Sequence, residues 1–154
     1  GNEPCHQVAY MFNYAGEPWK TQRAVRHIME TEYLNEPGGL SGNDDAGQMS
    51  AWYMFAAMGF YPVCPGTPYY LLASPSFPSF TLNLESGNTF TVKACNASQK
   101  NIYIQSATLN GKAYTRNYIT HQDIVNGGVM EFVMGNEPNK EWGAGAENCP
   151  PEVM

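Results

Sequence analysis

The segment from residue 46 to residue 60 constrains the fold more than any other part of the chain. It is apolar on nearly every side of a helical wheel, with Trp52, Met54, Phe55 and Met58 spread around the axis. A helix without a polar face has to be surrounded by other helices. Only two further helical segments are evident, so we expect partner helices to lie upstream, outside this sequence.

The two other predicted helices precede this segment. Pro4 and Pro18 each stand where a first-turn proline belongs, and apolar residues recur at helical spacing after both. We expect a first helix over residues 4–15, closed by Gly16, and a second over residues 18–33. The turn signal over residues 35–39 ends the second helix.

The character of the chain changes after a proline-rich connector over residues 62–68. Short β-type runs follow, and Asn110-Gly111 is the strongest hairpin signal. The predicted strands cover residues 69–73, 80–84, 89–94, 102–105, 114–119 and 129–134. We therefore predict an α+β fold, divided into helices over 1–63 and an antiparallel, β-sandwich-like region over 64–154. Within the latter, residues 135–154 are expected to be irregular.

Composition narrows the function classes. The 154 residues are 43% apolar and carry a formal charge of −6, which argues against nucleic acid and anionic membrane surfaces as partners. No run approaches the roughly 20 apolar residues that span a bilayer, and no leader is evident, so we expect an excised piece or mature fragment. The four scattered cysteines argue against structural zinc and leave disulfides and free thiols open.

Asp44 and Asp45 are the candidate acid/base residues. They lie between Gly42 and Gly47, directly before the apolar segment. An aspartate at a helix start is an ordinary N-cap, because its side chain accepts a hydrogen bond from a free N–H of the first turn. Low crowding beside glycine also lets a substrate approach a carboxylate closely. Residue patterns alone leave both interpretations open.

A second polar cluster contains Asn2, Glu3 and His6. Carboxylate and amide oxygens suit Ca²⁺ rather than zinc. Glu3 before Pro4 is equally an ordinary helix entry. We find no Ser/His/Asp or Cys/His signature, no phosphate-binding glycine loop and no dinucleotide fingerprint.

Several motifs, in order and with short gaps, resemble glycoside hydrolase family 92. They are Gly1-Asn2-Glu3-Pro4-x-His6, Tyr10-Met11-Phe12-Asn13-Tyr14-Ala15-Gly16-x-Pro18-Trp19-Lys20-Thr21-Gln22, Gly39-Leu40-x-Gly42-Asn43-Asp44-Asp45-x-Gly47-Gln48-Met49-Ser50-Ala51-Trp52-Tyr53, Gly59-Phe60-Tyr61-Pro62-Val63-Cys64-Pro65-Gly66, Ser74-Pro75 and Leu109-Asn110-Gly111. The resemblance covers the chain from Gly1 to about Pro138.

This resemblance implies a calcium-dependent, exo-acting α-mannosidase, often α-1,2-specific, that hydrolyses with inversion. Family members resemble an N-terminal β-sandwich followed by a catalytic (α/α)6 barrel. The chain would then hold the last barrel helices and the terminal β-rich region. Relatives are commonly bacterial and act outside the cytoplasm, so we expect an extracytoplasmic location, whether periplasmic, cell-surface or secreted.

The resemblance also assigns roles to residues. Asp45 matches the general base; Asp44, Gln48 and His6 are candidates for orienting substrate or water. Glu3, and with it Asn2, matches the calcium site. Some relatives carry an acidic residue where Asn43 stands, so base strength or fine specificity is expected to differ here.

These implications lead to one main expectation and one alternative. The expected partners are a mannose-containing glycan and upstream domains of the same polypeptide. The general acid of the family lies upstream of Gly1 by this match, so the isolated chain should be inactive. The alternative is a non-catalytic carbohydrate-binding β-sandwich module.

Overall fold

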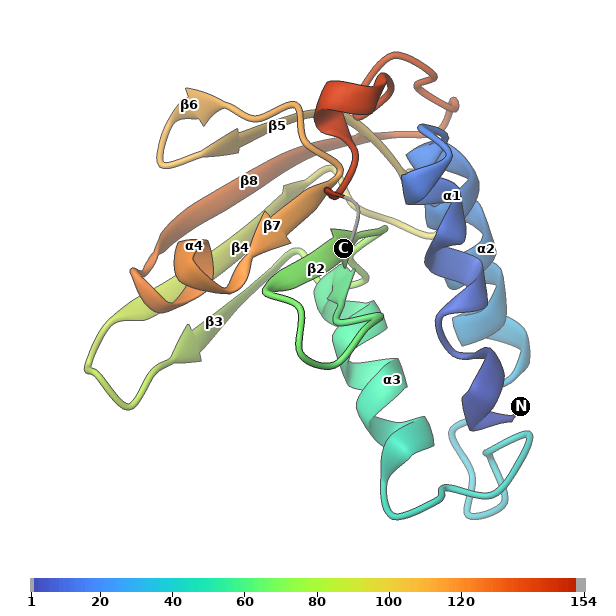
Figure 1. Cartoon of the computed structure of the whole chain (residues 1–154). Coiled ribbons are helices and arrows are strands. Elements are labelled where there is room, and N and C mark those ends of the chain that lie inside the picture. Colours follow the sequence, from blue (N-terminus) through green and yellow to red (C-terminus); the bar gives the residue numbers. More distant parts are fainter. Residues whose placement is uncertain (1, 152–154) are drawn as a thin grey trace.

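The computed structural model describes residues 2–151, in which four α-helices and three 3-10 turns pack beside two sheets (Figure 1). The helical elements before the first strand are the 3-10 turns η1 (Glu3–Cys5) and η2 (Val8–Tyr10) and the helices α1 (Met11–Tyr14), α2 (Pro18–Thr31) and α3 (Gln48–Met58). The α+β fold class predicted from the sequence is confirmed.

The strands form one sheet of three strands and one of five. The first has the order β1-β2-β7, with β1 (Phe60–Tyr61), β2 (Tyr69–Leu72) and β7 (Tyr118–Thr120). The second has the order β3-β4-β8-β5-β6, with β3 (Ser79–Asn83), β4 (Thr89–Cys95), β8 (Gly128–Gly135), β5 (Tyr103–Leu109) and β6 (Lys112–Ala113). Their pairings are antiparallel except for β4 with β8, which run parallel.

The prediction of one helix over residues 4–15 is wrong. Two 3-10 turns and the four-residue α1 take its place. In a continuous α-helix the His6 carbonyl would accept from the N–H of Tyr10. Instead, Tyr10 N–H donates to the carbonyl of Gln7 (2.9 Å), which leaves the His6 carbonyl to accept from the indole Nε1 of Trp52 (3.0 Å). Contact with α3 thus breaks the helical pattern.

Helices α2 and α3 are confirmed, each shorter than predicted. Helix α3 ends at Gly59, whose φ of +92° is left-handed. A Cβ at this position would lie 2.9 Å from Cβ of Pro75, so glycine is required both for conformation and for space. On the outer side of α3, Met54 is 53% exposed. The helices that we predict outside this chain would cover exposed apolar side chains such as Met54.

The β-rich region departs from prediction mainly between residues 110 and 128. The run predicted over residues 114–119 gives a strand only from Tyr118, because Asn117 turns its side chain into the interior. The short helix α4 (His121–Val125) was not predicted. Thr120 and Asp123 form a capping box at its start, with Asp123 N–H donating to Thr120 Oγ1 (3.1 Å).

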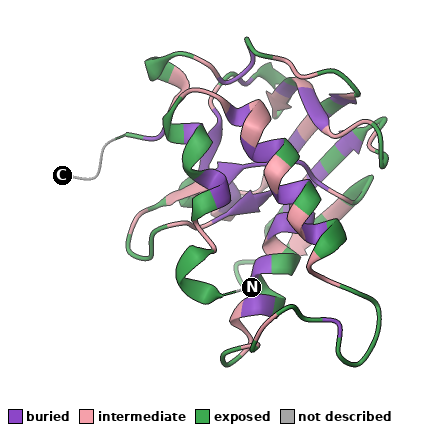
Figure 2. Ribbon diagram, turned by 90° about the vertical axis from the view of Figure 1, so that its right-hand side faces the viewer, coloured by how far each residue is buried: buried purple, intermediate pink, exposed green. Residues whose placement is uncertain are grey.

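Two hydrophobic clusters meet at β2. Leu72 belongs to the cluster between the two sheets, whereas Leu71 belongs to the cluster that packs the helices, with Val25 and Trp52. Figure 2 views the molecule from the helical side and shows buried residues, in purple, on the strands behind the helices. One strand thus contributes to both cores, as its alternating side chains require. The domain division at residue 63 stays a prediction.

Two fully buried asparagines join the helical elements to the strands. Asn13 Nδ2 donates to the carbonyls of Leu72 (3.0 Å) and Asn117 (2.7 Å). Asn117 Nδ2 donates in return to the carbonyls of Asn13 (2.9 Å) and Gly143 (2.8 Å). Four buried backbone carbonyls thereby gain a side-chain donor, and two of them, those of Asn117 and Asn13, also accept a backbone N–H, from Leu72 and Gly16.

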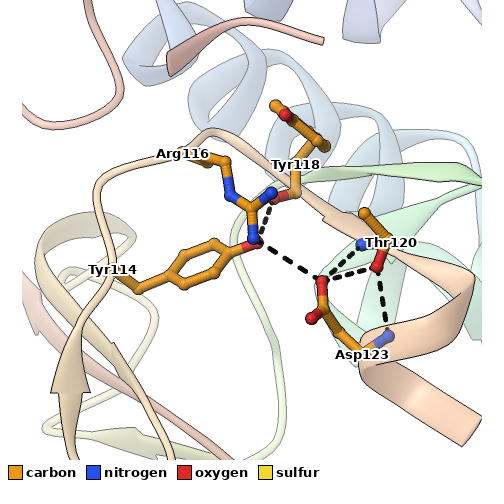
Figure 3. A network of polar contacts seen from close by, with 5 residues as sticks. All are labelled: Tyr114, Arg116, Tyr118, Thr120 and Asp123. Atoms are coloured by element: carbon orange, nitrogen blue, oxygen red, sulfur yellow. Dashed lines mark hydrogen bonds and ion pairs between the residues drawn. The ribbon is translucent and has the colours of Figure 1, made fainter. Parts of the chain in front are cut away.

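A polar network fixes the segment that leads into α4 (Figure 3). The Arg116 guanidinium lies 4.9 Å from the Tyr114 ring centroid and 5.1 Å from that of Tyr118, and one of its nitrogens lies 3.7 Å from Asp123 Oδ2. Tyr114 donates its hydroxyl to the carbonyl of Tyr118 (2.8 Å). Because these groups satisfy one another, we assign the network a structural role.

The segment after β8 is irregular, as predicted, apart from the 3-10 turn η3 (Ala146–Asn148). It is nevertheless packed, since Trp142 is buried and donates Nε1–H to the Tyr114 carbonyl (3.1 Å). Residues 152–154 of the predicted tail lie outside the described residues. In the part of the chain that the structure describes, no disulfide joins Cys5, Cys64, Cys95 and Cys149 to one another. Among residues 2–151, no helix combines the length and apolarity needed to cross a membrane.

Candidate active site

The loop that carries Asp45 into α3 has an unusual backbone. Asp45, Ala46 and Gly47 have φ values of +49°, +59° and +92°, a run of three residues in the left-handed region. For residues other than glycine this region is disfavoured, and such conformations persist only where the surrounding structure holds them. Strained backbone of this kind is found preferentially at functional sites.

Asp44 is the residue that caps α3 through its side chain. Its Oδ1 accepts hydrogen bonds from the backbone N–H and from the hydroxyl of Ser50, both at 3.0 Å. The N-cap position itself is Gly47, so the predicted capping role is carried out from three residues further upstream. Asp45 is exposed, and its carboxylate has no hydrogen bond or ion pair within residues 2–151.

The preceding segment is held against α2 and α3. Tyr33 pairs with Leu40 in an isolated β-bridge, and the Tyr33 hydroxyl donates to the carbonyl of Met49 (3.2 Å). The Tyr33 ring also stacks on Trp52, with centroids 5.7 Å apart and planes 7° from parallel. These contacts fix both ends of the loop that contains the two aspartates.

His6 and Gln48, both predicted site residues, lie in contact. Gln48 Nε2 is 3.2 Å from His6 Nδ1 and donates to the Tyr61 hydroxyl (3.1 Å). His6 Nε2 lies 3.1 Å from the sulfur of Met49. Burial lowers the pKa of His6, while the carboxylates of Glu3 and Asp45 act in the opposite direction. Of the predicted site residues, His6 and Gln48 are thus in direct contact at the start of α3.

Two hollows adjoin His6. One, of about 300 Å³, is lined by Glu3, His6 and Gln48 together with Tyr61. The other, of about 280 Å³, is lined by Asn2 and His6 with aromatic residues of α3 and its surroundings. Neither is lined by Asp44 or Asp45.

Sequence reasoning did not single out Tyr61, Met49 or Tyr33 as site residues. Tyr61 is buried and stacks on Tyr10, with centroids 5.1 Å apart. Tyr61 lies inside the motif Gly59-Phe60-Tyr61-Pro62, which was the available signal. No sequence pattern pointed to Tyr33, because its role in the site depends on its contacts with Met49 and Trp52 of α3.

Asn2 and Glu3 offer the type of oxygen ligand that calcium prefers, but too few of them to complete a site. Both side chains are exposed and have no hydrogen bond within residues 2–151, so their oxygens are available to a hard cation. Calcium takes about six to eight oxygen ligands. Across the described part of the chain, no three His, Cys, Asp or Glu side chains cluster in a way that could hold a metal. Further ligands would have to be backbone carbonyls, water, sugar hydroxyls or other parts of the protein.

Comparison with known proteins gives a consistent result. The family model described as the glycosyl hydrolase family 92 catalytic domain matches residues 1–136. An uncharacterized secreted glycosidase from Arthroderma benhamiae is 37% identical over 156 residues, covering 99% of this chain and 20% of that protein.

Solved structures agree. A family GH92 alpha-mannosidase from Bacteroides thetaiotaomicron, in complex with mannoimidazole, superposes with a TM-score of 0.95 at 46% identity, covering 99% of this chain and 20% of that one. A GH92 inverting mannosidase from the same bacterium superposes with a TM-score of 0.91 at 43% identity, with 97% and 20% coverage. This chain therefore spans about a fifth of the length of the relatives it matches.

Proposed function

Because this chain belongs to glycosyl hydrolase family 92, we propose that the full-length protein is an exo-acting, inverting α-mannosidase that releases α-1,2-linked mannose from glycans. Support comes from relatives whose names read alpha-mannosidase, inverting mannosidase and secreted glycosidase. The last of these names also supports the extracytoplasmic location that we propose.

The observation that carries this proposal is the state of Asp45. Its carboxylate is exposed and unpaired within residues 2–151, on a left-handed loop that leads directly into Gln48, the first residue of α3. In an inverting hydrolysis, a carboxylate takes a proton from water while the water oxygen bonds to the anomeric carbon. A carboxylic acid on the other face protonates the departing glycosidic oxygen, and the two carboxyl groups lie roughly 6.5–9.5 Å apart. We assign the first role to Asp45 and the second to a residue outside this chain.

Gln48 is proposed to orient substrate or water, whereas Asp44, whose Oδ1 is engaged by Ser50, is proposed to act through the loop rather than on the substrate. The Gln48 amide nitrogen is occupied by His6 and Tyr61, whereas its amide oxygen has no partner within residues 2–151 and can accept from a hydroxyl or water. Both ring nitrogens of His6 face protein groups, so this side chain would act mainly by shaping the pocket and holding Gln48.

Glu3 and Asn2 are proposed as part of a Ca²⁺ site. When bound, the ion would hold sugar hydroxyls and favour a distorted ring. Both residues lie on the turn that precedes His6, which places them beside the hollows described above.

The test is mannose release from α-1,2-linked mannobiose by the full-length protein, following the first-formed anomer by NMR. We expect the β-anomer, no release by the isolated 154-residue chain, and loss of activity on calcium chelation. Asp45→Asn should lower kcat by about 10²- to 10⁴-fold, the usual worth of acid–base assistance. Glu85→Gln, the same carboxylate-to-amide change at an exposed position, is the matched control.

The opposite outcomes are equally informative. Wild-type activity in Asp45→Asn would show that Asp45 is not the general base. Inertness of the full-length protein on all mannosides, with glycan binding that survives chelation and the loss of Asp45, would favour a carbohydrate-binding module instead.

A further inference from the structure

The contact between Asp44 and Ser50 closes a loop around the three left-handed residues. From this geometry we propose that Asp44 and Ser50 are positioning residues that fix the direction of the Asp45 carboxylate. The proposal rests on the proposed function, because it assigns to Asp45 the role of general base. Ser50 belongs to no site considered so far.

The closure uses backbone and side chain together. Met49 N–H donates to the carbonyl of Asp44 (3.1 Å), and Gln48 N–H donates to the carbonyl of Asp45 (3.3 Å). Asp44 Oδ1 then receives two further bonds from Ser50, at the third position of α3. Gly47 makes no side-chain cap, so Asp44 alone satisfies the Ser50 N–H.

The direction of the Asp45 side chain depends on this closure. The Asp45 carboxylate has no partner of its own within residues 2–151, so the backbone of the loop sets the position and direction from which its side chain projects. Asp45 and Ala46 both hold a conformation that side chains disfavour, and nothing lies within 4 Å of a Cβ built on Gly47. Packing at Gly47 therefore does not hold the loop, and the two bonds from Ser50 are the side-chain hydrogen bonds that restrain it, beside the backbone bonds named above.

This role differs from direct contact with substrate. Asp44 is half-buried, its Oδ1 is engaged twice by Ser50, and it lines neither hollow beside His6. We call the two hydrogen bonds from Ser50 to Asp44 Oδ1 the clamp. The clamp needs an acceptor oxygen rather than a negative charge, and asparagine caps helices as well as aspartate does. Asn in place of Asp44 should therefore preserve the function, whereas Ala should not.

The experiment compares Asp44→Asn, Asp44→Ala and Ser50→Ala in the full-length protein, with steady-state kinetics on mannobiose and thermal unfolding. Asp44→Ala should lower kcat about 10- to 100-fold with KM unchanged, since a misplacement of about 1 Å can cost that much. Ser50→Ala keeps one of the two bonds and should lose less. Asp44→Asn should stay within about threefold of wild type.

Thr120→Ala is the matched control, because it removes a side-chain cap from α4, far along the chain from Asp45. It should lower the unfolding temperature without changing kcat. A fall in kcat for Asp44→Asn as large as for Asp44→Ala would overturn the clamp in favour of a role for the charge. A comparable fall in kcat for Thr120→Ala would also overturn the proposal, because it would show that the loss of activity in Asp44→Ala follows from lower stability.

If the wild-type protein releases no mannose, the proposed function fails. Crystal structures of the variants then test whether the bonds between Asp44 and Ser50 hold the loop. Asp44→Ala should then lose the left-handed run at Asp45 and Ala46, and Asp44→Asn should keep it. An unchanged loop in Asp44→Ala would refute the clamp independently of activity.

Discussion

Asn117 is the residue whose loss we expect to destabilise the chain most clearly through hydrogen bonding. Asn117→Ala removes both Nδ2 donors, to the carbonyls of Asn13 and Gly143. The Asn13 carbonyl keeps a bond from the N–H of Gly16 (3.2 Å), so its loss is that of one ordinary hydrogen bond, about 0.5–1.5 kcal/mol. The Gly143 carbonyl loses the only donor that it has within residues 2–151, at about 1–3 kcal/mol.

The expected decrease in the free energy of unfolding is therefore about 1.5–4.5 kcal/mol. For a chain of this length that corresponds to a fall in Tm of roughly 3–18 °C. Urea and thermal unfolding of the 154-residue chain, followed by tryptophan fluorescence, measure both quantities. Asn88→Ala is the control, because Asn88 is exposed and donates a single bond, to the Val125 carbonyl. The reasoning is refuted if Asn117→Ala costs no more than Asn88→Ala.

Three further predictions concern other buried groups. Burial raises the pKa of Tyr33 from 10.0 to about 12, so the folded chain keeps a proton that the unfolded chain loses, and this stabilisation is complete below pH 10 and disappears between pH 10 and 12. Unfolding temperatures measured across that range should fall less steeply in Tyr33→Phe than in wild type, and equal slopes would contradict the prediction. Trp142→Phe removes the Nε1 donor from the Tyr114 carbonyl and should cost about 1–3 kcal/mol in urea unfolding, whereas an unchanged midpoint would show that the bond is not needed. Gly59→Ala forces a side chain into a left-handed position against Pro75 and should cost more than about 1 kcal/mol, which calorimetry can check against Gly38→Ala, where nothing lies within 4 Å.

The sequence predicted the elements whose signals are local. Prolines at helix starts, the turn over residues 35–39 and the Asn110-Gly111 hairpin all recur in the structure, as do α2, α3 and the alternation in β3. The capping box of Thr120 and Asp123 was also readable, and α4 was missed because five residues give no apolar period.

Features that depend on distant contacts could not be predicted. The parallel pairing of β4 with β8 and the exchange between Asn13 and Asn117 join residues far apart in the sequence. The N-terminal helix was predicted as continuous because its apolar spacing is helical, yet the bond from Trp52 to the His6 carbonyl decides otherwise. At the site, the aspartates were identified from the motif, whereas the clamp by Ser50 depends on a left-handed loop that no residue pattern revealed.

The position of β2 between two cores has a consequence for how the chain opens. Leu71 and Leu72 are neighbours, yet each is buried in a different cluster, and the Leu72 amide bonds to Asn117. An opening that frees these amides has to disturb both clusters at once. Their hydrogen exchange should therefore be the slowest in the chain, and it should report the helices and the strands as one cooperative unit.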